Sequence, residues 1–282
     1  MSLFARALRF GRRKMGSLLE FVDAPSHRSG NGGGNGGLAS STLEGGLTDH
    51  TYGDLYERHS QALPPDASIG DGDFALIGRI ELAILLAEGL ADTSSLIDFG
   101  CGTGRLAVHA IPRLTHGQYI GTDIANGMLT VARDEIARRF PSATCRVSWI
   151  KQPPDVFVQK SGTADMICAF SVFTHMEHED SFRYLKDAHR VVRPGGKFVF
   201  SCLPMSLKPA QEIFLEQASH PFAQRWLNVR NITTTIEMME ILARLAGWTV
   251  KTWYPGDHAC IPMPDSTEKR ALGQSTCILV RN

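Results

Sequence analysis

A short apolar strand that runs directly into three closely spaced glycines constrains this chain more than any other feature. The strand is predicted at Leu96–Phe99, and the glycines follow as Gly100, Gly102 and Gly104. Glycine adopts backbone conformations that a Cβ atom forbids, so the loop can turn tightly and a ligand can approach its backbone. A helix is predicted from Arg105, and the N–H groups of a helix N-terminus favour a negatively charged group. The sequence therefore predicts a ligand-binding turn between a strand and a helix.

From about residue 74 the hydrophobic pattern alternates between short apolar runs and helical spacing. Such alternation is typical of a parallel sheet covered by helices on both faces. The last two strands have no helix between them, so we expect one of them to be antiparallel. The predicted strands are 96–99, 119–123, 145–150, 166–170, 197–200, 248–254 and 277–280. The predicted helices include 74–90, 105–111, one marked by 128–136, one that stops at Pro194-Gly195-Gly196, and one capped by Thr234 and Glu237 that ends at Gly247.

An acidic residue stands at the end of each of the first two strands. Asp98 lies just before the glycines, and Asp123 lies 19 residues after Gly104. Ligands of open α/β sheets bind beyond the carboxyl ends of the strands, and a carboxylate after the second strand can accept hydrogen bonds from the hydroxyls of a ribose. The pattern therefore indicates a ligand that contains a nucleoside.

The spacing of the glycines argues against a dinucleotide. The dinucleotide fingerprint is G-x-G-x-x-G, whereas this loop is G-x-G-x-G. The Asp98 carboxylate would repel a pyrophosphate at the start of the helix, but it would suit an ammonium group. An NAD(P)-dependent oxidoreductase therefore stays open only as a less favoured alternative.

Four segments in chain order resemble the class I S-adenosylmethionine-dependent methyltransferases, and the resemblance covers about residues 94–205. It implies an α/β fold, with a Rossmann-like seven-stranded, mostly parallel sheet, helices on both faces and the last strand antiparallel. It also implies S-adenosyl-L-methionine as the cofactor. The matching segments are Leu96-Ile97-Asp98-Phe99-Gly100-Cys101-Gly102-Thr103-Gly104, Gly121-Thr122-Asp123-Ile124, the stretch from Ala164 to Met176, and Arg190-Val191-Val192-Arg193-Pro194-Gly195-Gly196.

The resemblance assigns roles to the glycines and to the two acids. Gly100, Gly102 and Gly104 would line the methionine end of the cofactor. Asp98 would act on its ammonium group, directly or through water, and Asp123 would bind its ribose hydroxyls. The predicted cofactor-binding residues are Asp98, Gly100, Cys101, Gly102, Gly104, Asp123, Ile124, Gln152, Phe170 and Ser171.

Four further positions complete this predicted site. Ile124 would pack on the adenine, and the backbone of Phe170 and Ser171 would border the methionine. One position departs from the family, because an acid often follows the third strand and Gln152 stands there instead. The side-chain oxygen of Gln152 could accept the hydrogen bond of the adenine amino group.

The implied chemistry, an in-line displacement, depends mostly on alignment and desolvation. A hydroxyl or amine acceptor must also lose a proton, and His175 is the candidate catalytic base. The alternative is that His175 orders its loop through a backbone hydrogen bond. Tyr52, Tyr56 and Trp226 are the candidate substrate-binding residues, and residues 204–233 form a candidate acceptor lid. The alternative for both segments is a packing or surface role.

We therefore expect a methyltransferase that acts on an oxygen or nitrogen of a small-molecule or saccharide-like acceptor. A catalytically inactive, cofactor-binding regulatory protein is the alternative, because it would keep the same glycines and Asp123. The 29 basic and 29 acidic side chains balance, which argues against a globally basic nucleic-acid-binding protein. The six cysteines form no C-x-x-C pair, so no metal site is predicted.

The sequence predicts a basic, glycine-rich, flexible extension at 1–47 and a methyltransferase domain at 48–282. Residues 1–28 hold six basic and two acidic side chains, with apolar residues between them. Three interpretations stay open: an amphipathic helix on a membrane surface or a partner protein, an organellar transit peptide, and a solvated terminus. No apolar run of about 18 residues is present, and we expect a cytoplasmic protein.

Overall fold

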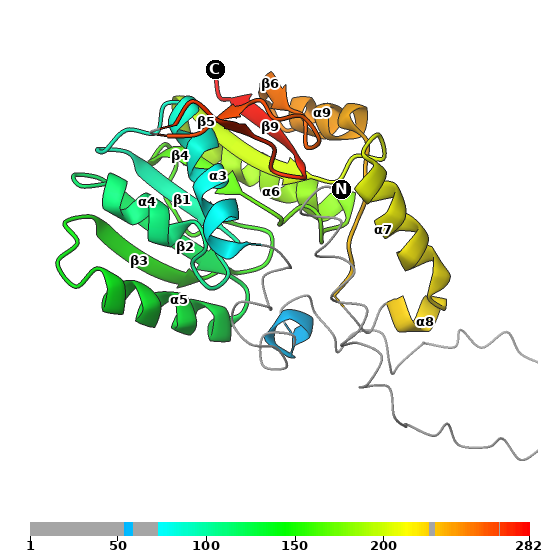
Figure 1. Ribbon diagram of the computed structural model, residues 1–282, viewed down its shortest axis with the longest axis horizontal. Coiled ribbons are helices and arrows are strands. Elements are labelled where there is room, and N and C mark those ends of the chain that lie inside the picture. The colour runs from blue at the N-terminus through cyan, green and yellow to red at the C-terminus, as the bar shows by residue number, and fades with distance from the viewer. Residues whose placement is uncertain (1–53, 59–72, 226–228, 265) are drawn as a thin grey trace, which may run out of the picture.

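The structure is a computed structural model that describes residues 54–58, 73–225, 229–264 and 266–282 (Figure 1). The predicted extension at 1–47 lies outside these residues, as do two of the candidate substrate-binding residues, Tyr52 and Trp226.

Seven strands form one sheet in the order β3-β2-β1-β4-β5-β9-β6 (Figure 1). The strands from β3 to β5 pair in parallel, and β9 runs antiparallel to both of its neighbours. The predicted mostly parallel, seven-stranded α/β sheet with an antiparallel last strand is therefore confirmed. The strands are β1 (Ser95–Phe99), β2 (Gln118–Asp123), β3 (Arg146–Lys151), β4 (Ala164–Ala169), β5 (Val192–Cys202), β6 (Thr249–Tyr254) and β9 (Ser275–Val280), and a separate small hairpin joins β7 (Ile261–Pro262) to β8 (Lys269–Arg270).

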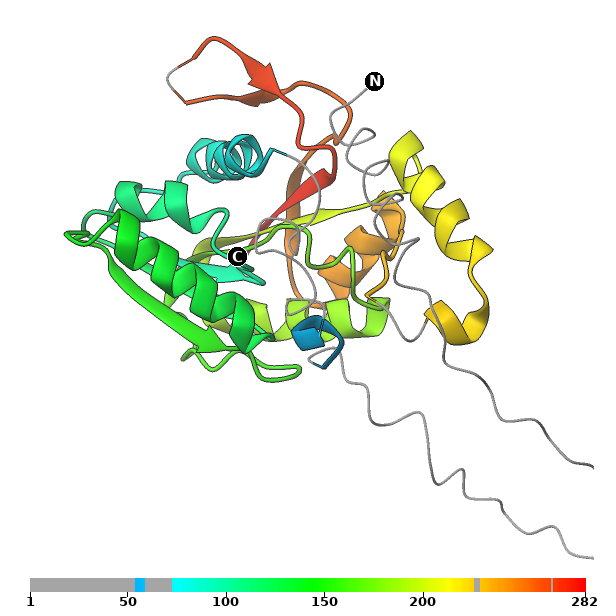
Figure 2. The same cartoon turned by 60° about the horizontal axis from the view of Figure 1, so that its bottom comes forward.

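Helices cover both faces of the sheet (Figures 1 and 2). Helices α3, α4 and α5 lie on one face, and α6 and α9 lie on the other. Within the described residues no helix is long and apolar enough to cross a bilayer. The helices are α3 (Phe74–Ala87), α4 (Ala107–Ala110), η1 (Ile111–Arg113), α5 (Asn126–Arg139), α6 (His178–Val191), α7 (Lys208–Ser219), α8 (Phe222–Arg225) and α9 (Ile236–Leu245).

Alternation along the central strands decides which face each side chain joins. In β1, Leu96 packs in the core beneath α3 and α4, whereas Ile97 packs beneath α6 and α9. In β4, Met166 and Ile167 divide in the same way. Asp98 is two residues after Leu96, so its carboxylate lies on the α3 face of the sheet. The burial of the apolar residues in β1 thus fixes the direction of a candidate site residue.

Two predicted boundaries are wrong by a few residues. Helix α6 ends at Val191, and the Pro194-Gly195-Gly196 turn lies within β5, where the pairing with β4 shifts register. Helix α9 is capped by Thr235, whose hydroxyl accepts the N–H of Met238 at 3.1 Å. Thr234 instead bonds to other segments through its backbone and hydroxyl, which is why it is unavailable as a cap.

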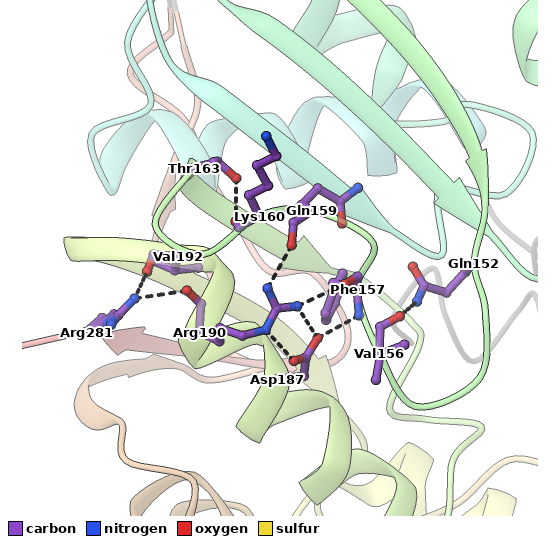
Figure 3. Close-up of polar contacts among 10 residues, drawn as sticks. All are labelled: Gln152, Val156, Phe157, Gln159, Lys160, Thr163, Asp187, Arg190, Val192 and Arg281. Atoms are coloured by element: carbon purple, nitrogen blue, oxygen red, sulfur yellow. Dashed lines mark hydrogen bonds and ion pairs between the residues drawn. The ribbon is translucent and has the colours of Figure 1, made fainter.

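The loop between β3 and β4 is fastened to α6 by one arginine (Figure 3). The Arg190 guanidinium donates to the carbonyls of Phe157 at 2.9 Å and Gln159 at 2.8 Å, and it binds both oxygens of Asp187. Asp187 in turn accepts the N–H of Phe157 at 2.7 Å. Because Gln152 begins this loop, the arginine also supports one side of the candidate cofactor site.

We expect Arg190→Met to lower the free energy of unfolding by about 1–2 kcal/mol, because hydrogen bonds from a charged donor are lost and backbone carbonyls lose their partner. Lys160→Met is the matched control, because it removes one exposed positive charge from the same loop. Thermal unfolding of the two variants measures the difference. Equal melting temperatures would contradict the fastening role of Arg190.

Candidate functional site

The glycine loop follows β1 and turns across the end of β2. The N–H groups of Gly100 and Cys101 both donate to the carbonyl of Thr122, at 2.8 and 2.9 Å. Gly100, Gly102 and Gly104 have φ angles of 72°, 54° and 91°, where other residues are strained. The predicted need for glycine at these three positions is confirmed.

Close packing gives a second reason for glycine at the start of the loop. A Cβ atom on Gly100 would lie 2.5 Å from Cγ2 of Val172, in the loop that follows β4. The two loops therefore touch at a point where no side chain fits. The loops that follow β1 and β4, two strands that pair in the sheet, therefore also meet beyond its carboxyl edge.

Asp98 is buried between β2 and β4. The Tyr119 hydroxyl donates to its Oδ2 at 2.5 Å, and the Cys168 thiol lies 3.6 Å from its Oδ1. Burial raises the pKa of Asp98 to about 7, although the hydrogen bond from Tyr119 opposes the rise. Tyr119 and Cys168 carry no sequence signal as site residues, because they face Asp98 only through the placing of β2 and β4 on either side of β1.

Asp123 ties the end of β2 to the glycine loop. Its Oδ2 accepts the N–H of Gly102 at 2.9 Å, and its Oδ1 accepts the N–H of Ala125 at 2.9 Å. Burial raises its pKa to about 6, while these backbone hydrogen bonds act in the opposite direction. A carboxylate has about four lone-pair positions, so both oxygens keep the capacity to accept ligand hydroxyls.

Gln152 presents one amide oxygen that has no partner among the described residues. Its Nε2 donates to the carbonyl of Val156 at 2.6 Å (Figure 3) and to the carbonyl of Pro153 at 3.0 Å. Carbonyls only accept hydrogen bonds, so this assignment of the amide is fixed. The side-chain oxygen is buried without a hydrogen bond. Its backbone N–H donates to the carbonyl of Asp123 at 2.8 Å, which places Gln152 next to the ribose-binding candidate.

His175 follows β4 and makes the backbone hydrogen bond that the structural alternative predicted. Its Nδ1 lies 2.7 Å from the carbonyl oxygen of Arg230. Because a carbonyl only accepts, Nδ1 carries the proton, and Nε2 carries the lone pair of the neutral imidazole. The same hydrogen bond thus orders the loop and selects the tautomer that a general base at Nε2 would need.

Residues 54–58 connect the two sides of the site. The Glu57 carboxylate accepts the N–H groups of Asn126 at 2.8 Å and Gly127 at 3.3 Å, at the start of α5. Tyr56 meets the ring of His175 edge to face, with 5.9 Å between ring centroids. Tyr56, a candidate substrate-binding residue, therefore lies beside the candidate base. Glu57 was missed, although a carboxylate at a helix N-terminus is a common stabilising contact.

The segment from 229 to 235 lines the loop after β4. The N–H of Ile232 donates to the carbonyl of Thr174 at 2.6 Å, and Arg230 forms an ion pair with Glu177. His178 and Thr234 bond through their side chains at 3.0 Å. Residues 229–233 are the end of the predicted lid at 204–233, and α7 and α8 lie in the middle of that lid.

Three more predicted cofactor-binding residues are buried or half-buried beside the site. Cys101 is buried, and burial raises the pKa of its thiol far above the usual value. Ile124 is half-buried just after β2, and Phe170 is buried in the core beneath α3. No cluster of histidine, cysteine, aspartate or glutamate that could hold a metal occurs among the residues described.

Residues 96–196 match the family described as a methyltransferase domain. This span begins in β1 and ends in the turn of β5, so it contains the glycine loop, both acids and the loop after β4. In this region the chain is similar to methyltransferases. The resemblance seen in the sequence is thereby confirmed.

Curated relatives match over part of their length. A malonyl-[acyl-carrier protein] O-methyltransferase of Geobacter sulfurreducens is 28% identical over 120 residues, which are 43% of this chain and 42% of that protein. A ubiquinone biosynthesis O-methyltransferase of Coxiella burnetii is 23% identical over 159 residues, which are 53% and 64% of the two chains. The matched region is thus about two fifths to two thirds of these relatives.

Solved structures share the fold of this methyltransferase domain. Magnesium protoporphyrin IX methyltransferase of Synechocystis PCC 6803 with bound SAH has a TM-score of 0.58 at 14% identity, over 81% of this chain and 98% of that one. The PH0226 protein of Pyrococcus horikoshii OT3 has a TM-score of 0.57 at 18% identity, over 80% and 99%. At such identities the likeness concerns the fold.

The two buried carboxyls make the stability of the domain depend on pH. The folded-state pKa values of Asp98 and Asp123 are about 7 and 6, above the ordinary value of 3.8. The folded protein therefore binds protons more tightly than the unfolded chain, and stability falls as pH rises through that window.

Ionisation of Asp98 should lower the free energy of unfolding by up to about 4 kcal/mol between pH 4 and pH 7, following the linkage of pKa and stability. We expect Asp98→Asn to remove this part of the pH dependence. Denaturant unfolding at several pH values measures the slope, with the exposed-residue variant Asp134→Asn as the control. A slope for Asp98→Asn as steep as that of the unmodified protein would show that burial of Asp98 does not cause it.

Proposed function

We propose that this chain is an S-adenosylmethionine-dependent methyltransferase that transfers a methyl group to an oxygen or nitrogen of a small-molecule or saccharide-like acceptor. The observation that carries the proposal is the arrangement at the carboxyl ends of β1, β2 and β3. Three glycines with positive φ lie there beside two buried carboxyl groups and the side-chain oxygen of Gln152, which has no hydrogen bond to any described residue.

The residues at this edge fit the three parts of the cofactor. The glycine loop offers a backbone surface without side chains for the methionine end, and Asp98 supplies negative charge behind it. Asp123 supplies acceptors for the ribose hydroxyls. The Gln152 oxygen would gain the donor it lacks from the adenine amino group, which relieves the cost of a buried, unsatisfied acceptor.

The chain's own contribution to the reaction is alignment, exclusion of water and removal of a proton. When bound, S-adenosylmethionine supplies an activated methyl group. Tyr56 and Glu57 hold residues 54–58 between α5 and the loop after β4, where they would screen the reacting groups from water. His175 would take the acceptor proton at Nε2, the ring nitrogen that does not face the Arg230 carbonyl.

The acceptor would approach His175 beside the loop after β4, which the segment 229–235 holds in place. The two relatives described above are named O-methyltransferases, one for a malonyl-[acyl-carrier protein] and one in ubiquinone biosynthesis, which favours oxygen as the acceptor atom. We keep the acceptor class broad. We also propose that 48–282 is the catalytic domain, that 1–28 contacts a membrane surface or a partner protein, and that the protein acts in the cytoplasm.

Binding of S-adenosylhomocysteine tests the cofactor site. We expect the unmodified protein to bind it in a calorimetric titration and not to bind NAD, and we expect Asp123→Ala to abolish binding because the ribose loses its acceptor and the glycine loop loses its tie. Asp134→Ala, on the exposed side of α5, is the matched control. Absence of S-adenosylhomocysteine binding by the unmodified protein would refute the proposed function.

Turnover is tested with pooled acceptors, labelled cofactor and mass spectrometry. A labelled product identifies the acceptor. Tight binding without labelling of any acceptor would favour the regulatory alternative over the enzyme.

We expect His175→Gln to lower kcat by about 100-fold or more, in the range of general-base effects, while S-adenosylhomocysteine affinity stays unchanged. The pH–rate profile of the variant should lose the rise that deprotonation of an imidazole produces. His116→Gln, an exposed histidine far from the site, is the control. A profile that keeps its shape would restrict His175 to the ordering of its loop.

A further inference from the structure

A closed ring of three hydrogen bonds joins the end of β4 to β5 and to the residue before β9. The N–H of Ser171 donates to Oγ of Ser201 at 2.8 Å, and the Ser201 hydroxyl donates to Oε1 of Gln274 at 2.6 Å. Nε2 of Gln274 then donates to Oγ of Ser171 at 3.0 Å. The backbone and the side chain of Ser171 are thus both held by the same ring.

Two of the three ring residues are buried, and Ser171 is half-buried. Ser201 is fully buried, and Gln274 is 6% exposed. In this amide orientation each polar atom of the Gln274 side chain has a partner. In the opposite orientation the Ser201 hydroxyl would have no acceptor within the ring. Buried hydrogen bonds of this kind are costly to break, because the groups left behind have no water to replace the lost partner.

Ser171 needs such support because its backbone is in the left-handed region. Its φ is 59°, and it is one of two non-glycine residues with positive φ in the described part of the chain. An L-residue with a side chain is disfavoured there, and such a conformation persists only where surrounding contacts impose it. The ring supplies those contacts from Ser201 in β5 and from Gln274 just before β9.

The turn at Ser171 sets the position of Val172, which touches the glycine loop. A Cβ atom on Gly100 would lie only 2.5 Å from Cγ2 of Val172, so the Val172 side chain packs directly against the loop. The carbonyl of Val172 also accepts the N–H of His175 at 3.0 Å. The backbone conformation of Ser171 therefore affects the position of the glycine loop, at the predicted methionine end of the site, and the position of His175, the candidate base.

We infer that Gln274 is a positioning residue for the cofactor site, acting through Ser171 and Val172 on the glycine loop. This inference rests on the proposed function, because that function names the ligand of the site. The ring of hydrogen bonds is observed independently of any ligand. Gln274 is 103 residues from Ser171 in sequence and outside the region of family resemblance.

The test compares four variants: Gln274→Met, Ser171→Gly, the double variant, and Thr276→Val. Met keeps the length of Gln and removes the two ring hydrogen bonds that Gln274 makes, to Ser201 and to Ser171. Gly adopts a positive φ without support, so it should make the ring unnecessary. Thr276 is the matched control, because it is also buried, lies two residues from Gln274, and its hydroxyl has no hydrogen bond to any described residue.

We expect Gln274→Met to weaken S-adenosylhomocysteine binding about tenfold in the unmodified protein, but by less than about threefold when it is added to Ser171→Gly. Ser171→Gly is thus the reference for the double variant, and Thr276→Val should bind like the unmodified protein. A purely structural role for Gln274 would weaken binding equally with serine or glycine at 171. If Gln274→Met binds normally, or if it weakens the Ser171→Gly variant by the same factor as the unmodified protein, the inference is wrong.

Amide hydrogen exchange of the peptide that covers residues 170–176 gives a readout without ligand. It should become faster in Gln274→Met and stay unchanged in Thr276→Val. Unchanged exchange in Gln274→Met would overturn the ring as a support for Ser171, whether or not the protein binds S-adenosylhomocysteine. Failure of the unmodified protein to bind, with faster exchange in the variant, would instead count against the proposed function alone.

Discussion

The hydrogen bond between Asp123 and the N–H of Gly102 is the contact on which the candidate site depends. It fastens the end of β2 to the loop that follows β1, at 2.9 Å and out of water. The other carboxylate oxygen holds the chain that enters α5. A residue expected to bind a ribose therefore also holds the loop expected to bind the methionine end. A change at Asp123 would affect both parts of the site.

Other segments reach the same place from distant parts of the chain. Residues 54–58 contact α5 and His175, the segment 229–235 bonds to the loop after β4, and Gln274 holds Ser171. All of them meet at the carboxyl edge of the sheet. A parallel sheet with helices on both faces leaves that edge to loops, and loops can come from any part of the sequence. The surroundings of His175 and Ser171 are assembled in that way.

Local signals were sufficient where the physical requirement was local. The glycines at 100, 102 and 104 must adopt positive φ, so the loop could be predicted from residue type alone. The strand and helix pattern gave the sheet, but it misplaced the end of α6 and the cap of α9. At both boundaries, pairing with another strand or bonding to a distant side chain decided the outcome. The small β7–β8 hairpin was not predicted, because two-residue strands produce no periodic pattern.

The sequence by itself determined the class of fold, the glycine loop and the two acids at the ends of β1 and β2, because periodicity, glycine and strand ends are properties of short segments. Only the tertiary structure decided that Tyr119 faces Asp98, that Gln152 turns its oxygen away from its own loop, that His175 carries its proton on Nδ1, and that Gln274 supports Ser171. These contacts join residues from separate strands and loops, and their partners are set by strand order and register, which no local pattern encodes.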